Sequence, residues 1–351
     1  MAETEDTYVG KPIEMFIGDD GSIFVVDAFT NRVIRFGGDG HPIQLYGRHG
    51  AGPGEFGLVG TAGAVAGAVV AIGDHYPPMI ELFDLDSGDA VGSVSVAVTP
   101  RAFGVWQDRI WMAGLDESSD WRTLAVSSVP EMLIAGAEAA PTIRFEFLRA
   151  PRPYLENAMI RGVAGGIRLD VKDDVLVGFA ASPFLLRVGT DGSVTDTVFL
   201  EVRNRRGMPN EDEFIEAMDP ARSSQEELIK LASLLRGLAR DGDGNIFTVH
   251  QDAEFASPER IVAEFFVSSI RADSGVQCVD TRLPTHKLSM PVTAFRGDEL
   301  FVLEQHLDAG REDGVKAVVR RYLVDVSSCT GMVLVNRHGK CPGYRHGKCP
   351  G

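Results

Sequence analysis

The sequence feature that most constrains the fold is a run of short strands and tight turns at residues 19–56. Three turn sequences divide this run: Asp20-Gly21, Asn31-Arg32 and Asp39-Gly40. Between the turns, residues 23–27 and 33–36 carry apolar side chains at a period of two, which is typical of β-strands. A meander of about 40 residues in which such strands follow one another is the unit of a β-propeller blade.

The same order of polar turn and apolar strand returns five more times along the chain. The further copies begin at Ala66, Gln107, Lys172, Asp241 and Arg296. Their irregular spacing indicates long insertions in some loops. We therefore expect an all-β, six-bladed β-propeller that forms one domain over residues 1–336, followed by a flexible tail at residues 337–351.

The segment at residues 19–56 resembles the NHL repeat. The residues that match the repeat are Asp20, Gly21, Phe24, Val25, Asp27, Asn31, Arg32, Phe36 and Gly40. The other copies keep only the rhythm of strands and turns. As a whole, the chain resembles the divergent six-bladed, NHL-like propellers of bacterial envelope proteins.

This resemblance implies structural rather than catalytic roles for the turn residues of the first copy. These residues are Asp20, Gly21, Asp27, Asn31, Arg32 and Gly40. By analogy with the family, Asp27 and Arg32 are expected to form a pair that braces the turns. The glycines permit turn backbone angles that other residues resist.

One stretch departs from the strand rhythm. Residues 201–240 are polar at first and then carry a helical pattern, in which Ser223-Ser224 precede Glu226-Glu227 at capping-box spacing. Four leucines then fall on one helical face: Leu228, Leu231, Leu234 and Leu235. The pattern predicts a short helix near 223–236, which either packs on the surface of the propeller or docks a partner.

The charge of the chain excludes some partners. A formal net charge of −16 leaves no basic excess to displace the counterions of a nucleic acid. The small cationic island of Arg203, Arg205 and Arg206 either grips an acidic group or balances the acidic residues at 211–216. No apolar run reaches the roughly 20 residues that span a bilayer.

Polar residues at two strand ends could face the central channel of a propeller. Three of them are the candidates for a channel site: His250, Asp252 and Glu304. Carboxylates there could hold Ca²⁺, and a histidine among them could help to hold Zn²⁺. The alternative is that the polar residues of these strand ends, His250, Gln251, Glu304 and Gln305, form hydrogen bonds to the backbones of neighbouring blades.

All four cysteines follow residue 277. Cys278 and Cys329 flank strands of the last two blades, so a disulfide between them is geometrically plausible, and two buried free thiols are the alternative. A disulfide would place the protein in an oxidising compartment, the periplasm or the cell exterior, with a signal peptide that the chain shown lacks; without it the protein could be cytoplasmic. The tail repeats RHGKCPG, whose residues His338, Cys341, His346 and Cys349 could bind zinc, form a disulfide or remain solvated.

Two functions remain open. The first is a non-enzymatic extracytoplasmic binding or scaffold protein without a cofactor, which holds a protein partner through a propeller face. One version is an extrinsic subunit that stabilises a larger envelope or membrane complex and binds it peripherally. The second is a metal-dependent propeller hydrolase or lyase, with Ca²⁺ or Zn²⁺ in the channel. We also expect the ring to close by pairing residues 15–19, or the preceding residues 7–16, with residues 331–336 in one blade.

Overall fold

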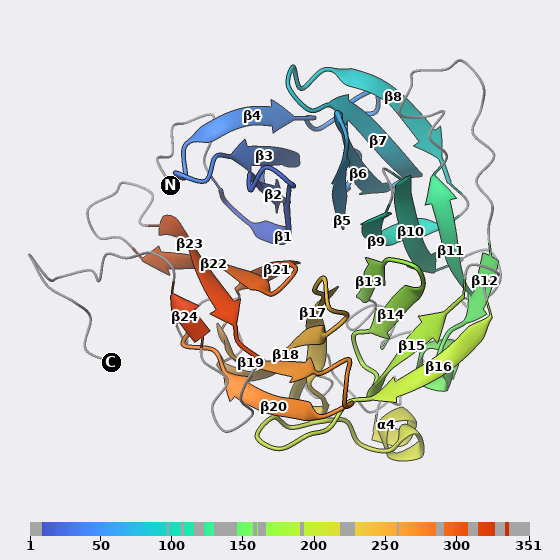
Figure 1. Ribbon diagram of the computed structural model, residues 1–351. Coiled ribbons are helices and arrows are strands. Elements are labelled where there is room, and N and C mark those ends of the chain that lie inside the picture. The colour runs from blue at the N-terminus through green and yellow to red at the C-terminus, as the bar shows by residue number, and fades with distance from the viewer. Residues whose placement is uncertain are drawn as a thin grey trace, which may run out of the picture.

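Antiparallel sheets of four strands stand around a central axis in the computed structural model (Figure 1). The structure describes residues 9–96, 98–106, 109–115, 123–129, 146–156, 160, 166–189, 193–217, 229–257, 260–285, 291–307, 315–326 and 334–336. Within these ranges the chain is an all-β propeller, and every sheet is built from four strands that are consecutive in sequence.

The sheets follow the chain in order. The first two contain β1 (Pro12–Ile17), β2 (Ile23–Asp27), β3 (Arg32–Phe36) and β4 (Pro42–Tyr46), then β5 (Val59–Ala66), β6 (Val69–His75), β7 (Pro78–Asp84) and β8 (Ala90–Ser95). The next two contain β9 (Thr99–Trp106), β10 (Arg109–Leu115), β11 (Thr123–Val129) and β12 (Glu146–Arg149), then β13 (Ile167–Val171), β14 (Val175–Phe179), β15 (Phe184–Val188) and β16 (Val194–Phe199). The last two contain β17 (Leu234–Arg240), β18 (Ile246–Ser257), β19 (Arg260–Ile270) and β20 (Gln277–Arg282), then β21 (Val292–Arg296), β22 (Glu299–Leu307), β23 (Val315–Val324) and β24 (Leu334–Asn336).

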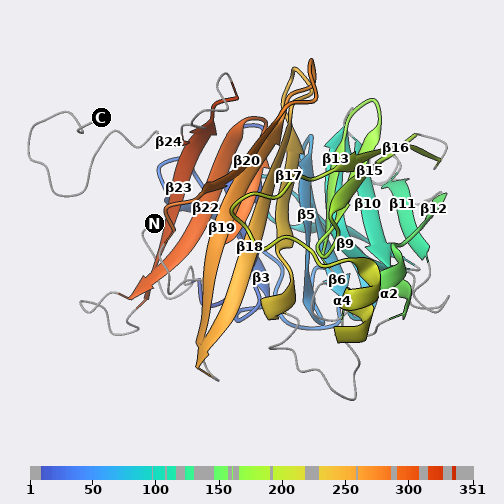
Figure 2. The ribbon, with the colours of Figure 1, turned by 90° about the horizontal axis from the view of Figure 1, so that it is seen from below.

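The first strand of each sheet lies nearest the axis, and the fourth lies at the rim (Figure 1). The turn between the first and second strands of each sheet lies at one end of the ring, called here the turn end. The opposite end carries the connections between sheets and is called the connector end. Helices α2 (Arg152–Glu156) and α4 (Glu211–Ala217) lie side by side there (Figure 2).

The hydrophobic core lies between adjacent sheets. Phe24 and Tyr46 of the first sheet pack with Phe83 of the second, and all three side chains are almost fully buried. Each sheet therefore has two buried faces, and β2 and β14 are buried at every position. Burial of apolar surface at about 25 cal/mol per Å² drives this arrangement.

The predicted repeat units begin one strand too late. The segment at residues 19–56 starts at the β1–β2 turn, so it contains β2, β3 and β4 of the first sheet but lacks β1. The other predicted units likewise start near the second strand of a sheet. The apolar pattern did not predict the innermost strands, because they carry charged or small residues beside the axis, such as Glu14 in β1 and Arg168 in β13.

The predicted ring closure is also wrong. Strand β24 pairs with β23, where Leu323 lies opposite Val335, and β1 pairs with β2 of its own sheet. The first and last strands, β1 and β24, therefore do not share a sheet. The ring closes instead by packing, because β1 lies against β21 and the first and last sheets share an apolar cluster that includes Met15 and Phe301.

The predicted helix near 223–236 is right at residues 229–231, which are helical, and wrong at its C-terminal end. Leu234 and Leu235 begin strand β17, and residues 218–228 lie outside the described part. The two leucines pack into different clusters on opposite faces of their sheet. Since both faces of a propeller sheet are buried, adjacent apolar residues fit a strand, and leucine spacing does not distinguish it from a helix.

The predicted fold class, a six-bladed propeller with a helical insertion near 223–236, is therefore wrong as stated: its units, its closure and the extent of its helix differ from the structure. The all-β propeller architecture itself is confirmed. In the described part of the chain, no helix has the length and apolarity needed to cross a membrane. The predicted tail at residues 337–351, with its paired His and Cys residues, lies outside the described residues.

Candidate functional site

Asp27 anchors the segment that enters the first sheet. Its buried carboxylate accepts hydrogen bonds from the backbone N–H groups of Gly10, Lys11 and Phe29, at 3.2, 2.6 and 3.1 Å, and from the hydroxyl of Thr30 at 2.7 Å. This carboxylate therefore holds the incoming chain and the β2–β3 turn together. In the described part of the chain its partners are backbone N–H and hydroxyl groups, and they do not include the expected Arg32.

Two other sheets repeat this arrangement at the end of their second strand. Asp74 accepts hydrogen bonds from the backbone N–H groups of Gly57, Leu58 and Tyr76. Asp252 accepts one from the backbone N–H of Arg206 at 2.7 Å, and another from the hydroxyl of Ser233. Asp252 therefore anchors the chain that enters the fifth sheet.

Asn31 joins the first sheet to the second. Its backbone φ is 54°, and its side-chain Nδ2 donates to the carbonyl of Phe56 at 2.6 Å while its Oδ1 accepts from the N–H of Val59 at 2.9 Å. Asparagine tolerates this left-handed backbone better than most residues. A turn residue of the repeat therefore positions the connection between neighbouring sheets.

The brace at the turn end joins Asp20 and Arg35, not Asp27 and Arg32. Arg35 Nη2 lies 2.8 Å from Asp20 Oδ2, and Ser22 also donates to this carboxylate. Similar pairs of a turn carboxylate with a third-strand arginine occur in two more sheets: Asp174 with Arg187 and Glu299 with Arg321. The turns themselves use Gly21 and Gly40, with φ of 82° and 84°.

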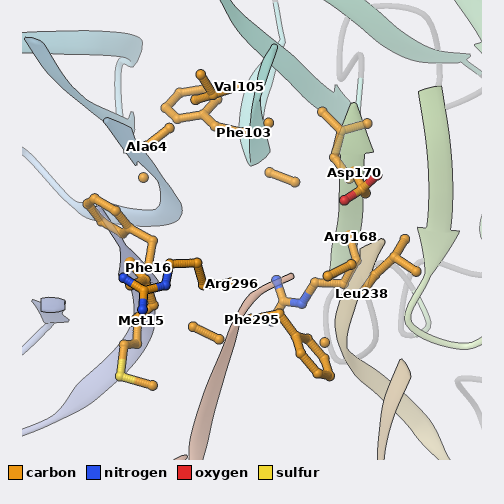
Figure 3. A pocket seen from close by; sticks show the side chains of 18 of the residues that line it. Met15, Phe16, Ala64, Phe103, Val105, Arg168, Asp170, Leu238, Phe295 and Arg296 are labelled. Atoms are coloured by element: carbon orange, nitrogen blue, oxygen red, sulfur yellow. The ribbon is translucent and has the colours of Figure 1, made fainter. Parts of the chain in front are cut away.

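A cavity of about 300 Å³ lies on the axis. The innermost strands β1, β5, β9, β13, β17 and β21 all contribute to its wall. Its apolar lining includes Phe16, Phe103, Leu238 and Phe295 (Figure 3). The cavity reaches the turn end, where Asp19 and Gly297 line it.

Three charged side chains meet at the connector end of this cavity. Arg168 of β13 reaches across to Glu14 of β1, with Nη1 and Oε2 3.1 Å apart, and its Nε donates to the backbone carbonyl of Arg236 at 2.6 Å. Arg236 of β17 donates through Nε to the side-chain oxygen of Gln251. Two guanidinium groups therefore accompany one carboxylate.

The charges of this group affect one another. Burial raises the pKa of Glu14, although the nearby Arg168 opposes that rise. Burial, together with the positive charge of Arg168, lowers the pKa of Arg236 to about 10. The sequence carries one signal of this group: isolated charged residues inside short strands.

The charged residues nearer the turn end are paired among themselves. Arg240 forms ion pairs with Asp170 and Asp174, and Arg296 contacts Glu299 with Nη2 and Oε2 2.7 Å apart. Their charges therefore largely cancel locally. The excess positive charge of the cavity lies with Arg168 and Arg236.

The structure does not bring the three channel candidates into this cavity. His250 and Asp252 lie on β18, and Glu304 lies on β22; both are second strands, and none of the three residues lines the axial cavity. Glu304 is fully buried and forms an ion pair with Arg320. Among the described residues, no group of three or more His, Cys, Asp or Glu is arranged to hold a metal.

His250 belongs instead to a buried cluster beside the fifth sheet. The side chain is 1% exposed, and neither ring nitrogen has a hydrogen-bond partner in the described part of the chain. Burial lowers the pKa of His250 well below its ordinary value, and the charge of Arg205 lowers it further. Arg205 forms a buried ion pair with Asp280, with Nε and Oδ1 2.9 Å apart.

The cationic island is therefore mostly structural. Arg205 binds Asp280, and Arg206 Nη1 donates to the carbonyls of Ile229 and Ala253. The backbone of Arg203 also donates to Asp280. These contacts, rather than the acidic residues at 211–216, account for Arg205 and Arg206.

Cys278 is 3% exposed. It lies on β20, in the fifth sheet. Cys329, the partner predicted for it, lies outside the described residues, so that pairing stays a prediction.

Exposed apolar side chains gather at the connector end of the first two sheets. Phe29 is 73% exposed, Leu58 is 53% exposed and Tyr76 is 77% exposed. The backbone N–H of His75 donates to the carbonyl of Leu58, which places Leu58 beside Tyr76, and Asn31 ties the turn of Phe29 to the same connection. We call these three residues the connector-end patch.

Comparisons with known proteins support the fold. No family model matches the chain. It is 29% identical over 86 residues to NHL repeat-containing protein 3 of Homo sapiens, a match that covers 24% of this chain and only 25% of that protein's length.

Two solved structures share the architecture more fully. A Bacteroides fragilis protein assigned as exported matches with a TM-score of 0.58 at 10% identity, over 86% of this chain and 82% of its own. A member of the DUF4221 family from Bacteroides vulgatus matches with a TM-score of 0.56 at 12% identity, over 91% and 95%. The chain is a β-propeller. At these identities the likeness shows the fold alone, and the NHL resemblance extends to part of the chain.

Proposed function

We propose that this protein is a non-enzymatic, extracytoplasmic binding or scaffold protein that holds a protein partner through its connector end. The observation that carries the proposal is the connector-end patch. Aromatic side chains dominate the binding energy of protein interfaces, and here two of them stand exposed on loops that hydrogen bonds hold in place. In this proposal the protein is an extrinsic subunit that stabilises a larger envelope or membrane complex.

Buried side chains hold the loops that carry the patch in place through hydrogen bonds. Asp27 fixes the turn of Phe29, Asp74 fixes the backbone beside Leu58 and Tyr76, and Asn31 links the two sheets. A rigid presentation lowers the ordering cost of binding. The patch therefore combines exposed apolar surface with the rigidity that a docking surface needs.

One observation supports an extracytoplasmic location, and with it we propose the predicted disulfide of the buried Cys278, which an oxidising compartment would allow. The Bacteroides fragilis protein that shares the architecture is assigned as exported. The alternative function, a hydrolase or lyase with channel Ca²⁺ or Zn²⁺, has less support, because its candidate residues lie on second strands away from the axial cavity.

A double substitution of the patch tests the proposal. In Phe29→Ser/Tyr76→Ser, we expect recovery in a defined high-mass complex from native membranes to fall by about tenfold or more, because each lost aromatic anchor can cost 2 kcal/mol or more. The measurement is the amount of tagged protein that co-migrates with a fixed-stoichiometry partner on a native gel.

Phe199→Ser is the matched control, since Phe199 is 67% exposed but lies on β16 at the rim of the fourth sheet. Its recovery should equal that of the wild type. A wild-type protein that migrates alone, or an equal loss in the control, would contradict docking through the connector end.

The cysteine pairing gives a separate prediction. If Cys278 is joined to Cys329, both residues should resist alkylation in denatured protein until a reductant is added, since only free thiols react. Peptide mapping by mass spectrometry reports each cysteine individually. Alkylation of Cys329 without reductant would disprove this pairing, and Cys341 or Cys349 linked to Cys278 would replace it.

A further inference from the structure

The axial cavity contains an excess of positive charge at its connector end. Arg168 and Arg236 both belong to this group, whereas Glu14 is its single carboxylate. The excess is notable because the whole chain carries a net charge of −16. Two arginines thus accompany one carboxylate here, although acidic residues outnumber basic ones in the chain.

Such an arrangement is costly without a further anion. Two like charges in a site removed from bulk water repel one another, and each loses hydration. Both effects lower the pKa of Arg236. A bound anion between the two guanidinium groups would offset both.

The guanidinium groups also have unused donors. In the described part of the chain, Arg236 has Gln251 as its hydrogen-bond acceptor, and this bond engages Nε. Arg168 uses Nε for the carbonyl of Arg236 and Nη1 for Ile167 and Glu14. Both arginines line the cavity. The Nη groups of Arg236 and Nη2 of Arg168 are suited to a planar acceptor with two oxygens, such as a carboxylate.

We propose that the axial cavity binds a small organic monocarboxylate, whose carboxylate lies between Arg168 and Arg236. A single negative charge matches the excess of two guanidinium groups over Glu14, whereas a dianion would be repelled by that carboxylate. The apolar part of the ligand lies along Phe16, Phe103 and Phe295 (Figure 3). The ligand enters from the turn end, which the cavity reaches at Asp19 and Gly297.

The volume limits the ligand. A cavity of about 300 Å³ is at the small end of the range for ligand sites. It corresponds to about ten water molecules at roughly 30 Å³ each. Benzoate, with one carboxylate on an aromatic ring, is therefore a suitable probe.

Isothermal titration of the full-length protein tests the proposal. We expect benzoate to bind with one site per chain, while the neutral isostere benzamide and inorganic phosphate bind at least about tenfold more weakly. Equal binding of benzamide would overturn the role of the carboxylate. Equal or tighter binding of phosphate would overturn the choice of a monoanion, and the absence of benzoate binding at millimolar concentration would overturn the site.

Two substitutions should change the affinity in opposite directions. Arg236→Met removes one guanidinium and should weaken benzoate binding by about tenfold or more. Glu14→Gln removes the competing carboxylate at nearly the same volume and should tighten binding severalfold. Arg271→Met is the control, because Arg271 lies outside the cavity and should leave the affinity unchanged.

The opposite signs separate binding from general damage to the fold. A variant that unfolds would lose binding in both cases, so thermal unfolding of each variant is measured alongside. Weaker binding by a folded Glu14→Gln protein would overturn the assignment of charge roles. The test concerns the axial cavity alone, and its result is independent of docking through the connector-end patch.

Discussion

Asp280→Ala is expected to lower the free energy of unfolding by about 3–5 kcal/mol, because it leaves a buried arginine without its counter-charge. Asp280 is 1% exposed, and its Oδ1 accepts from Arg205 Nε at 2.9 Å. Its Oδ2 also accepts from the backbone N–H groups of Arg203 and Asn204, at 2.6 and 2.9 Å. The substitution therefore removes an ion pair and leaves buried donors unsatisfied.

Urea unfolding at neutral pH measures this loss. Asp273→Ala is the matched control, since its pair with Arg271 has a similar length of 2.7 Å but is solvent-exposed. Exposed pairs contribute about 0–1 kcal/mol, so the control should change little. Equal losses in the two variants would contradict the account.

A second substitution identifies the cause of the loss. In the Asp280→Ala background, Arg205→Met removes the buried charge and should restore part of the stability. If the double variant is as unstable as the sum of the two single variants, the ion pair is not the source of the effect.

His250→Leu is expected to reduce the loss of stability on acidification by up to about 2 kcal/mol between pH 7.5 and pH 5.0. The folded protein lowers the pKa of His250 well below 6.5, through burial and the charge of Arg205. In the unfolded chain His250 therefore binds a proton near pH 6.5, whereas in the folded protein it stays neutral at that pH. The stability contributed by neutral His250 is present above pH 6.5 and declines as the pH falls, by roughly 1.4 kcal/mol per unit.

The measurement compares urea unfolding of both proteins at the two pH values. Other groups titrate in this range, so the informative quantity is the difference between the wild type and His250→Leu. His41→Leu is the control, because His41 is exposed in the β3–β4 turn. Identical losses in the wild type and His250→Leu would show that His250 does not limit stability in acid.

Local sequence determined much of the strand and turn structure. The turns at Asp20-Gly21 and Asp39-Gly40 could be predicted because glycine there adopts a backbone conformation that other residues resist. The strands at residues 23–27 and 33–36 could be predicted because their apolar side chains are dense enough to signal burial. The β-propeller architecture followed from the repetition of these local signals.

Tertiary structure decided the first strand of each sheet. Strand β1 contains Glu14, and β13 contains Arg168 and Asp170, so neither has a clear apolar pattern. Charged residues can be buried in these strands because they pair with charges of other sheets near the axis. Those pairs form only when the ring is closed. The same reason explains why Leu234-Leu235 suggested a helix although both residues lie in β17.

The candidate sites divide in the same way. The sequence alone showed that Asp27 and Asn31 belong to structured turns, because the repeat pattern contains them. Only the tertiary structure brought Arg168, Arg236 and Glu14 together from three sheets, and placed His250 and Glu304 away from the axis. Contacts between residues more than 60 positions apart depend on how the sheets are arranged around the ring, and the periodicity of a single strand carries no information about that arrangement.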